Sequence, residues 1–188
     1  HAIDETYYYR WELLTKHMVY ASPEIGYVFS EFINRPGGYG TISCAMGHHI
    51  DDLRWLKNSW AVENYIRFWH EAPGANPRGY SNWYDYAIWG NYLVNGDKSF
   101  LLGELPSMEA QYQGWLDEHW DAGHQMFHWS GMHDGMEINI ESRQTQNDFD
   151  GGDSYRPTLN SYVYGDLNAI ANTLELAGDS TKAAEYRQ

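Results

Sequence analysis

Cysteine is almost missing from this chain of 188 residues, because Cys44 is its single one and an intrachain disulfide is therefore excluded. Basic residues are also scarce, with 12 Lys and Arg against 26 Asp and Glu and a formal net charge of −14. This balance argues against nucleic acids and anionic membranes as partners, since both repel an acidic surface. No apolar run approaches the roughly 20 residues of a membrane span.

Several well-known site motifs are also missing. The chain has no nucleophile elbow, phosphate loop or dinucleotide fingerprint. His48 and Asp52 stand four residues apart, but no HExxH motif or cysteine pair completes a metal site, so no catalytic metal is expected. The stretch NDFDGGD (147–153) resembles a calcium loop only superficially, because it lacks the alternating ligands and the terminal Glu. The sequence therefore predicts no cofactor, with calcium as the weak alternative.

Aromatic residues are abundant, with 9 Trp and 16 Tyr. Their flat faces suit packing between helices, and they equally suit stacking on the C–H faces of sugars. For any single aromatic residue, packing in the core is the simpler interpretation.

Helical periodicity dominates the rest of the chain. An Asn95-Gly96-Asp97 turn and a Gly178-Asp179 turn each separate two helical patterns, which indicates a weak repeat of helix hairpins. Pro106 should kink or restart the helix that contains it, and Asp4 is the expected N-cap of the first helix. The expected helices are 7–18, 50–69 as one helix or two, 81–94 with apolar residues on nearly all sides, 98–119, 157–177 and 180–188.

Two long connections, 21–47 and 121–155, lack a helical period. They contain only two candidate extended pieces, 26–32 and 137–140, so the fold is expected to be mostly α. Connections of this length in a compact domain are usually functional or disordered, and the aromatic residues of the second one favour function.

The second connection is also rich in carboxylates. A glycosidase needs two carboxyl groups across a sugar, one protonated as an acid and one ionised as a base or nucleophile. An acidic loop is more often merely solvated, so composition alone does not decide between the two. The carboxylates concerned are Asp134, Glu137, Glu141, Asp148, Asp150 and Asp153.

Taken in order, several motifs resemble those of one group of enzymes. They are YYYRW, GHHIDDLRWL, YSNWYDYAIWGNYLVNGD, HDGMEINIESR and YRPTLNSYVYGDLNAIANTLELAGD. In this order they resemble the six-hairpin, (α/α)6-barrel glycosidases close to trehalases, mannosylglycerate hydrolases and glycoside hydrolase family 63. The resemblance covers nearly the whole chain, and it is carried by the joint pattern, because each piece alone is unspecific.

The resemblance implies a toroid of helix hairpins with long loops at the active-site end. It implies hydrolysis of an α-linked glycoside by inversion, with Glu137 as the proton donor. Glu stands where relatives have Asp, so Asp134 is the competing candidate. The residues expected to hold the sugar by stacking or by hydrogen bonds are His48, His49, Arg54, Trp55, Trp83, Trp129, Arg143, Arg156 and Asn160.

The length of the chain departs from that family. Residues 1–188 have room for only part of the toroid at ordinary helix and loop lengths. We therefore expect one incomplete catalytic domain, with the remaining barrel and the catalytic base supplied by a longer polypeptide. The expected partner is an oligosaccharide or glycoside, and localisation is undecided, although analogy favours the periplasm or the extracellular space.

Two other functions fit the same residues. The first is a helical domain that binds carbohydrate without cleaving it. The second is a scaffold of α-hairpin repeats for protein partners, which predicts regular repeats and short loops. The long connection at 121–155 counts against the scaffold.

Overall fold

The computed structural model describes residues 1–31, 38–135 and 152–188, and these are mostly helical. The α-helices are α1 (Ala2–Lys16), α2 (Met46–Leu53), α3 (Trp60–Glu71), α4 (Tyr84–Asn95), α5 (Lys98–His119), α7 (Pro157–Ala177) and α8 (Ser180–Glu185). The strands are β1 (Met18–Ser22), β2 (Gly26–Phe29), β3 (Trp120–Asp121), β4 (Met126–Ser130) and β5 (Asp153–Tyr155). Short 3-10 helices are η1 (Gly38–Gly40), η2 (Ser43–Ala45) and η3 (Met132–Asp134).

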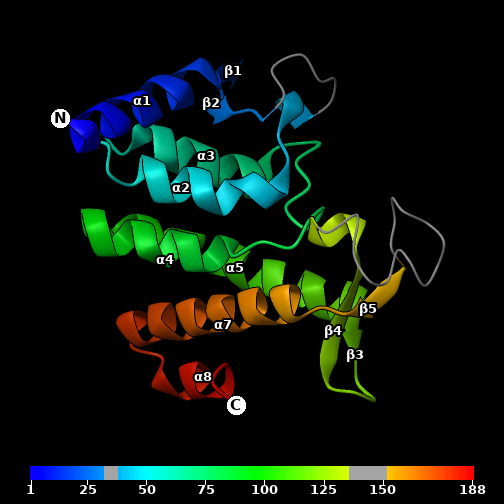
Figure 1. Cartoon of the computed structure of the whole chain (residues 1–188). Helices are drawn as coiled ribbons and strands as arrows, with labels where there is room; N and C mark the ends of the chain where they lie inside the picture. Colours follow the sequence, from blue (N-terminus) through cyan, green and yellow to red (C-terminus); the bar gives the residue numbers. More distant parts are fainter. Residues whose placement is uncertain (32–37, 136–151) are drawn as a thin grey trace.

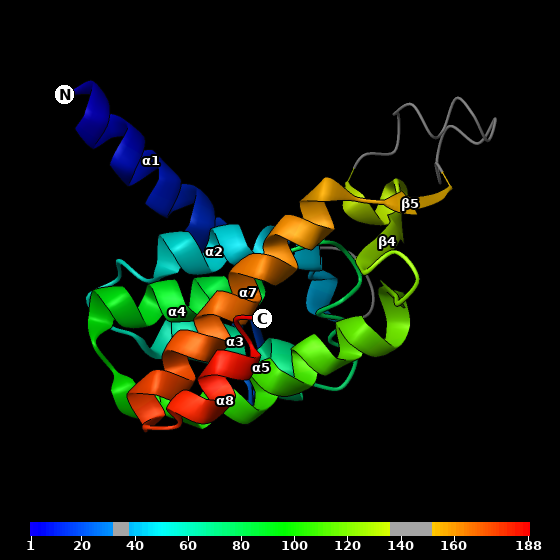
Figure 2. The same ribbon diagram turned by 90° about the horizontal axis from the view of Figure 1, so that it is seen from below.

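The helices from α2 onward form successive antiparallel hairpins arranged in two layers. Helices α2, α4 and α7 lie side by side in one layer, while α3, α5 and α8 cover one face of it (Figure 1, Figure 2). Helix α1 projects away from both layers. This arrangement confirms the predicted mostly α fold of helix hairpins in series, which forms part of a helical toroid.

The two predicted Gly-Asp turns have the same geometry. Gly96 and Gly178 each end a helix with a positive φ, of 73° and 91°, a conformation that glycine adopts without strain. Asp97 and Asp179 then cap the next helix, accepting hydrogen bonds from the backbone N–H groups of Phe100 and Lys182. The same turn therefore joins α4 to α5 and α7 to α8, in each case a helix of the first layer (the inner layer) to a helix of the second.

The core lies between the two layers. Fully buried side chains from both layers meet there, and apolar burial of this kind is the main favourable term in folding. The largest of them are Trp69, Trp115, Tyr65, Tyr84, Phe68 and Met46. Helix α4 is less enclosed than predicted, because its Tyr86 and Leu93 side chains are more than half exposed.

Three further expectations need correction. Helix α1 begins at Ala2, not after Asp4, so Asp4 lies in its first turn and is not its N-cap. Helix α5 continues through Pro106 without a restart, since Leu101 and Met108 hold the flanking turns in the core. The long connections contain more strand than predicted, in the β1–β2 hairpin and in a sheet of order β3-β4-β5.

The helices of the described residues were compared with what a membrane span needs. Among them, no helix combines the length and the apolar character that crossing a bilayer would require.

Candidate active site

Three neighbouring helices present the same end to one region of the surface. The N-terminal ends of α2, α4 and α7 lie together, close to β4, β5 and η3, at the end of the layers that carries the long loops (Figure 1). Unpaired backbone N–H groups at such ends create a positive potential, which favours carboxylates and other polar groups. The loop end of the inner layer is therefore where a site is expected in this fold.

Trp83 is at the centre of this region. Its indole crosses the first turn of α2 so closely that a Cβ at Gly47 would stand 2.5 Å from its Cε2. The ring centroid of His48 lies 4.5 Å from that of Trp83 in an edge-on contact, and the centroid of Tyr162 lies 4.9 Å away on another side. The indole Nε1 also donates to Asp51 Oδ2 at 3.4 Å. Two side chains from α2 and one from α7 thus hold the indole that precedes α4.

Asp134 adds a carboxylate to this group. It ends η3, which is attached to the loop before α4 because the Ser81 N–H donates to the His133 carbonyl at 2.9 Å. Burial, and then the negative charge of Asp134, raise the pKa of Tyr162 above its usual value of 10.0. The Oδ1 atom of Asp134 is buried and has no hydrogen-bond partner among the described residues. A buried oxygen of this kind is suited to a hydrogen bond with a ligand.

An open depression lies beside this group. It has a volume of about 400 Å³ and is lined by Trp83, Tyr86, Ser161, Tyr162 and Gly165. Its walls are mainly aromatic and carry the hydroxyl groups of Tyr86, Ser161 and Tyr162, while Gly165 adds no side chain. Aromatic faces of this kind suit the C–H faces of a pyranose ring.

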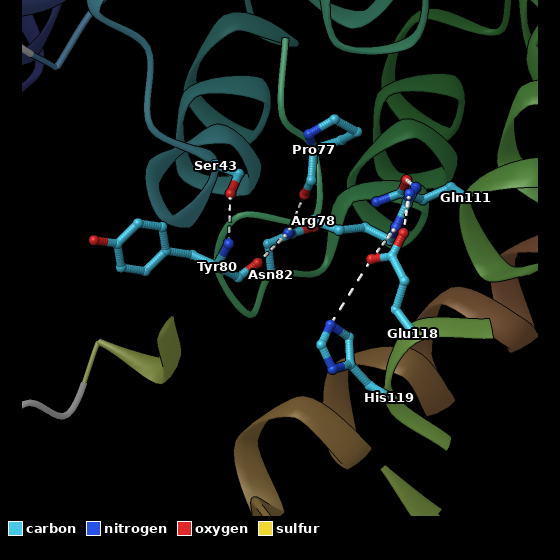
Figure 3. A network of polar contacts seen from close by, with 8 residues as sticks. All are labelled: Ser43, Pro77, Arg78, Tyr80, Asn82, Gln111, Glu118 and His119. Carbon is cyan, nitrogen blue, oxygen red and sulfur yellow. Dashed lines mark hydrogen bonds and ion pairs between the residues drawn. The ribbon is translucent and has the colours of Figure 1, made fainter. Parts of the chain in front are cut away.

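The loop that carries Trp83 is held at several points (Figure 3). Ser43 Oγ accepts from the Tyr80 N–H at 2.9 Å, and the Asn82 amide donates to the Pro77 and Tyr80 carbonyls. Arg78 makes a two-pronged contact with the Glu118 carboxylate of α5, at 3.0 and 2.6 Å. Because bidentate pairs restrict geometry in two directions, this loop is anchored to both layers.

Trp129 belongs to an adjacent cluster and not to the group around Trp83. Its ring centroid lies 3.6 Å from that of His119 and 4.9 Å from that of His133. Burial lowers the pKa of His119 to about 4, so its imidazole is neutral at pH 7 and does not pair ionically with Glu118. Trp129 and His119 thus pack against η3, the short helix that contains Asp134.

The side chains of Arg156 and Asn160 form hydrogen bonds with backbone groups. The buried Arg156 guanidinium donates to the Trp129 and Gly152 carbonyls at 3.0 and 3.2 Å. The Asn160 amide both accepts from the Phe127 N–H and donates to its carbonyl, at 2.9 and 2.8 Å. Both side chains fix β4 and β5 against the start of α7, so their contacts support a bracing role.

The other predicted residues in α2 and directly after it, His49, Arg54 and Trp55, do not line the depression. His49 Nδ1 meets the Tyr65 hydroxyl at 2.9 Å, and burial lowers its pKa to about 4. Arg54 donates to Asp51 at 2.7 Å and lies against Gly90. Trp55 is 59% exposed in a separate hollow beside α1. Of the predicted residues, the structure brings together His48, Trp83 and Asp134.

Glu137 and Arg143 lie outside the described residues, as do positions 147–151 of the stretch NDFDGGD. Among the residues that the structure does describe, no group of three His, Cys, Asp or Glu side chains is arranged to hold a metal ion.

Sequence reasoning missed Tyr162, Tyr86 and Gly47. Tyr162 and Tyr86 are ordinary aromatic positions on helices, and nothing in the spacing says that they face one depression. Gly47 lies in the connection 21–47, before the helix expected from residue 50, so its place in the first turn of α2 could not be predicted.

Comparisons with known proteins point to glycoside hydrolases. The sequence profile of the mannosylglycerate hydrolase MGH1-like glycoside hydrolase domain matches residues 38–188. A solved chain described as a sialidase superposes with a TM-score of 0.85 at 32% sequence identity, covering 99% of this chain and 17% of that one. This chain therefore spans less than a fifth of that similar protein. No curated protein matches.

Proposed function

This chain belongs to the mannosylglycerate hydrolase MGH1-like glycoside hydrolase family, within the (α/α)6-barrel glycosidases, and we propose that it forms part of an enzyme that hydrolyses an α-linked glycoside with inversion. The observation that carries the proposal is the position of Asp134. Its carboxylate lies beside Tyr162, with one buried oxygen that has no partner among the described residues, next to an aromatic depression.

In this mechanism a carboxylic acid of the segment 134–137 donates its proton to the glycosidic oxygen as the bond to the anomeric carbon breaks. The contacts of the described residues support Asp134, and the family pattern supports Glu137, which lies three residues further on. Removing water around such a carboxyl group favours its protonated form, which a general acid requires.

The sugar is proposed to stack in the depression. Trp83, Tyr86 and Tyr162 provide faces, while Ser161 and His48 provide groups that bond to hydroxyls. Trp129, Arg156 and Asn160 then act by holding the loop in place.

The second carboxylate is proposed to come from polypeptide outside residues 1–188, since this chain covers 17% of the similar sialidase chain. An inverting enzyme places its base about 6.5–9.5 Å from the acid, with a water molecule between them. That base takes a proton from the water as it attacks the anomeric carbon, so the product has the opposite configuration. No metal or cofactor takes part in this scheme.

A panel of glycosides tests the proposal with the full-length protein. The panel includes mannosylglycerate, sialosides, trehalose and other α-linked disaccharides, because the first two correspond to the names of the matched family and the similar chain. Proton NMR at early times should show a released sugar of inverted configuration. Binding without hydrolysis across the panel would overturn the proposal in favour of a carbohydrate-binding domain.

A further inference from the structure

Two carboxyl groups are fully buried where α4 meets α7, beneath the aromatic depression. Asp85 belongs to the first turn of α4 and Asp166 to the middle of α7, and their exposed fractions are 0% and 2%. Neither takes part in the proposed proton transfer. Buried carboxylates are costly, so their retention at one interface calls for a physical explanation.

Asp166 satisfies the start of α4. The first backbone N–H groups of a helix have no partner inside the helix and need one from elsewhere. The N-cap residue, Trp83, supplies no side-chain cap, and Asn82 accepts only from Tyr84, at 3.2 Å. The Asp166 carboxylate accepts from the Tyr86 N–H at 2.8 Å, and the Asp85 N–H also acts on it. Helix α4 is therefore capped by a side chain from a different helix.

The two carboxyl groups of the pair have different surroundings. Burial raises the pKa of both carboxyl groups well above the usual 3.8, and the negative charge of Asp166 raises that of Asp85 further. The backbone N–H groups of Tyr86 and Asp85 favour the ionised form of Asp166, whose Oδ2 has no hydrogen-bond partner among the described residues. Both oxygens of Asp85 have no hydrogen-bond partner among the described residues. The pair is consistent with an ionised Asp166 beside a protonated Asp85.

This contact lies directly under the depression. Tyr86, whose N–H is bound, lines the depression from α4, and Trp83 stands one residue before that helix. Gly165, next to Asp166, faces Tyr86 from α7, where a Cβ would lie 3.8 Å from its ring. A shift of the first turn of α4 would therefore move two aromatic walls relative to Tyr162.

We propose that Asp166 is a positioning residue of the aromatic depression, which joins the first turn of α4 to α7 and so sets the spacing of Trp83 and Tyr86 from Tyr162. The sugar-binding consequence rests on the proposed function, whereas the cap itself does not. Asp166 touches no sugar in this account.

Hydrogen exchange tests the cap without any ligand. In the full-length protein, Asp166→Ala should speed exchange of the Asp85 and Tyr86 amides at least tenfold relative to the rest of α4. Asp166→Asn keeps an accepting oxygen and should stay within about threefold of the parent. Leu174→Ala, at the buried far end of α7, is the control for general destabilisation and should not single out these two amides. Equal exchange of the two amides in the parent and in Asp166→Ala would overturn the proposal.

Sugar binding gives the second readout, measured by the change of tryptophan fluorescence on titration with mannosylglycerate. Asp166→Ala should weaken binding at least fivefold, Asp166→Asn less than twofold, and Leu174→Ala not at all despite its lower melting temperature. If the parent binds the sugar and Asp166→Ala binds it equally well, the positioning role is wrong. If the parent binds no glycoside, the proposed function fails, and exchange alone decides on the cap.

Discussion

The indole of Trp83 lies across the backbone of Gly47, at a distance that leaves no room for a side chain there. A Cβ at position 47 would stand 2.5 Å from Cε2 and 2.6 Å from Nε1 of the indole. Because the same ring contacts His48 and Tyr162, this close approach connects α2, α4 and α7 at the candidate site.

Gly47→Ala is therefore expected to displace Trp83. Alanine favours a helix over glycine by up to about 1 kcal/mol, but overpacking of a tight contact costs about 1–3 kcal/mol. The variant should melt at a lower temperature and bind glycosides about tenfold more weakly, as measured by calorimetry and fluorescence titration.

Gly103→Ala is the matched control, because Gly103 is exposed on α5 and no atom lies within 4 Å of a Cβ built there. It should raise the melting temperature slightly and leave binding unchanged. Equal behaviour of the two variants would show that the indole does not depend on Gly47.

His49 is expected to make stability fall in mild acid. Burial lowers its pKa from 6.5 to about 4, so its neutral form contributes stability that is complete above pH 6.5 and lost as the pH falls towards 4. The loss should be of the order of 3 kcal/mol over that window. Urea unfolding of the parent and of His49→Gln at several pH values measures it. The difference in slope between them should vanish above pH 7, and parallel curves from pH 7 to 4 would contradict the assignment.

Asp85 should have the opposite pH dependence. Its raised pKa means that the unfolded chain releases the proton more readily, so stability is lost as the pH rises from 3.8 towards the pKa of the folded state. Asp85→Asn removes this loss and should match the parent near pH 4 while melting higher at pH 8. Each 1 kcal/mol gained would appear as about 2–4 °C in a protein of this size. A variant that melts lower than the parent at pH 8 would contradict a protonated Asp85.

Removal of metal ions should leave the protein unaffected, since the proposed chemistry needs only carboxyl groups and water. Dialysis against EDTA is expected to change neither glycoside turnover nor the melting temperature. A loss that calcium restores would instead assign a role to the acidic stretch 147–153.

The fold was predictable where one local rule decided it. The hairpin turns at Gly96 and Gly178 follow from glycine at a left-handed position and aspartate at a cap, and both are found. The break predicted at Pro106 was wrong. The hydrogen bond that the proline loses lies on an exposed face, and the burial of Leu101 and Met108 in the flanking turns outweighs it. Strand β2 lies within the extended piece predicted at 26–32, whereas β4 and β5 could not be predicted, because their pairing joins the segments 126–130 and 153–155, which carry no clear alternation.

The site was only partly predictable. His48, Trp83 and Asp134 come from motifs, and the structure brings them to one region. The residues around them depend on which helix ends meet, which no local pattern encodes. Arg156 and Asn160 stay predictions as sugar contacts, and the hydrogen bonds described for them go to backbone groups.

The central claim is that a carboxylic acid of segment 134–137 protonates the leaving oxygen. It is tested most directly by comparing two substrates of the same sugar, an alkyl glycoside and a glycosyl fluoride, whose fluoride needs no proton to leave. One of the variants Asp134→Asn and Glu137→Gln should lose about 10²–10⁴-fold in kcat on the alkyl glycoside while keeping most of its turnover of the fluoride. Full activity of both variants on the alkyl glycoside would contradict the claim.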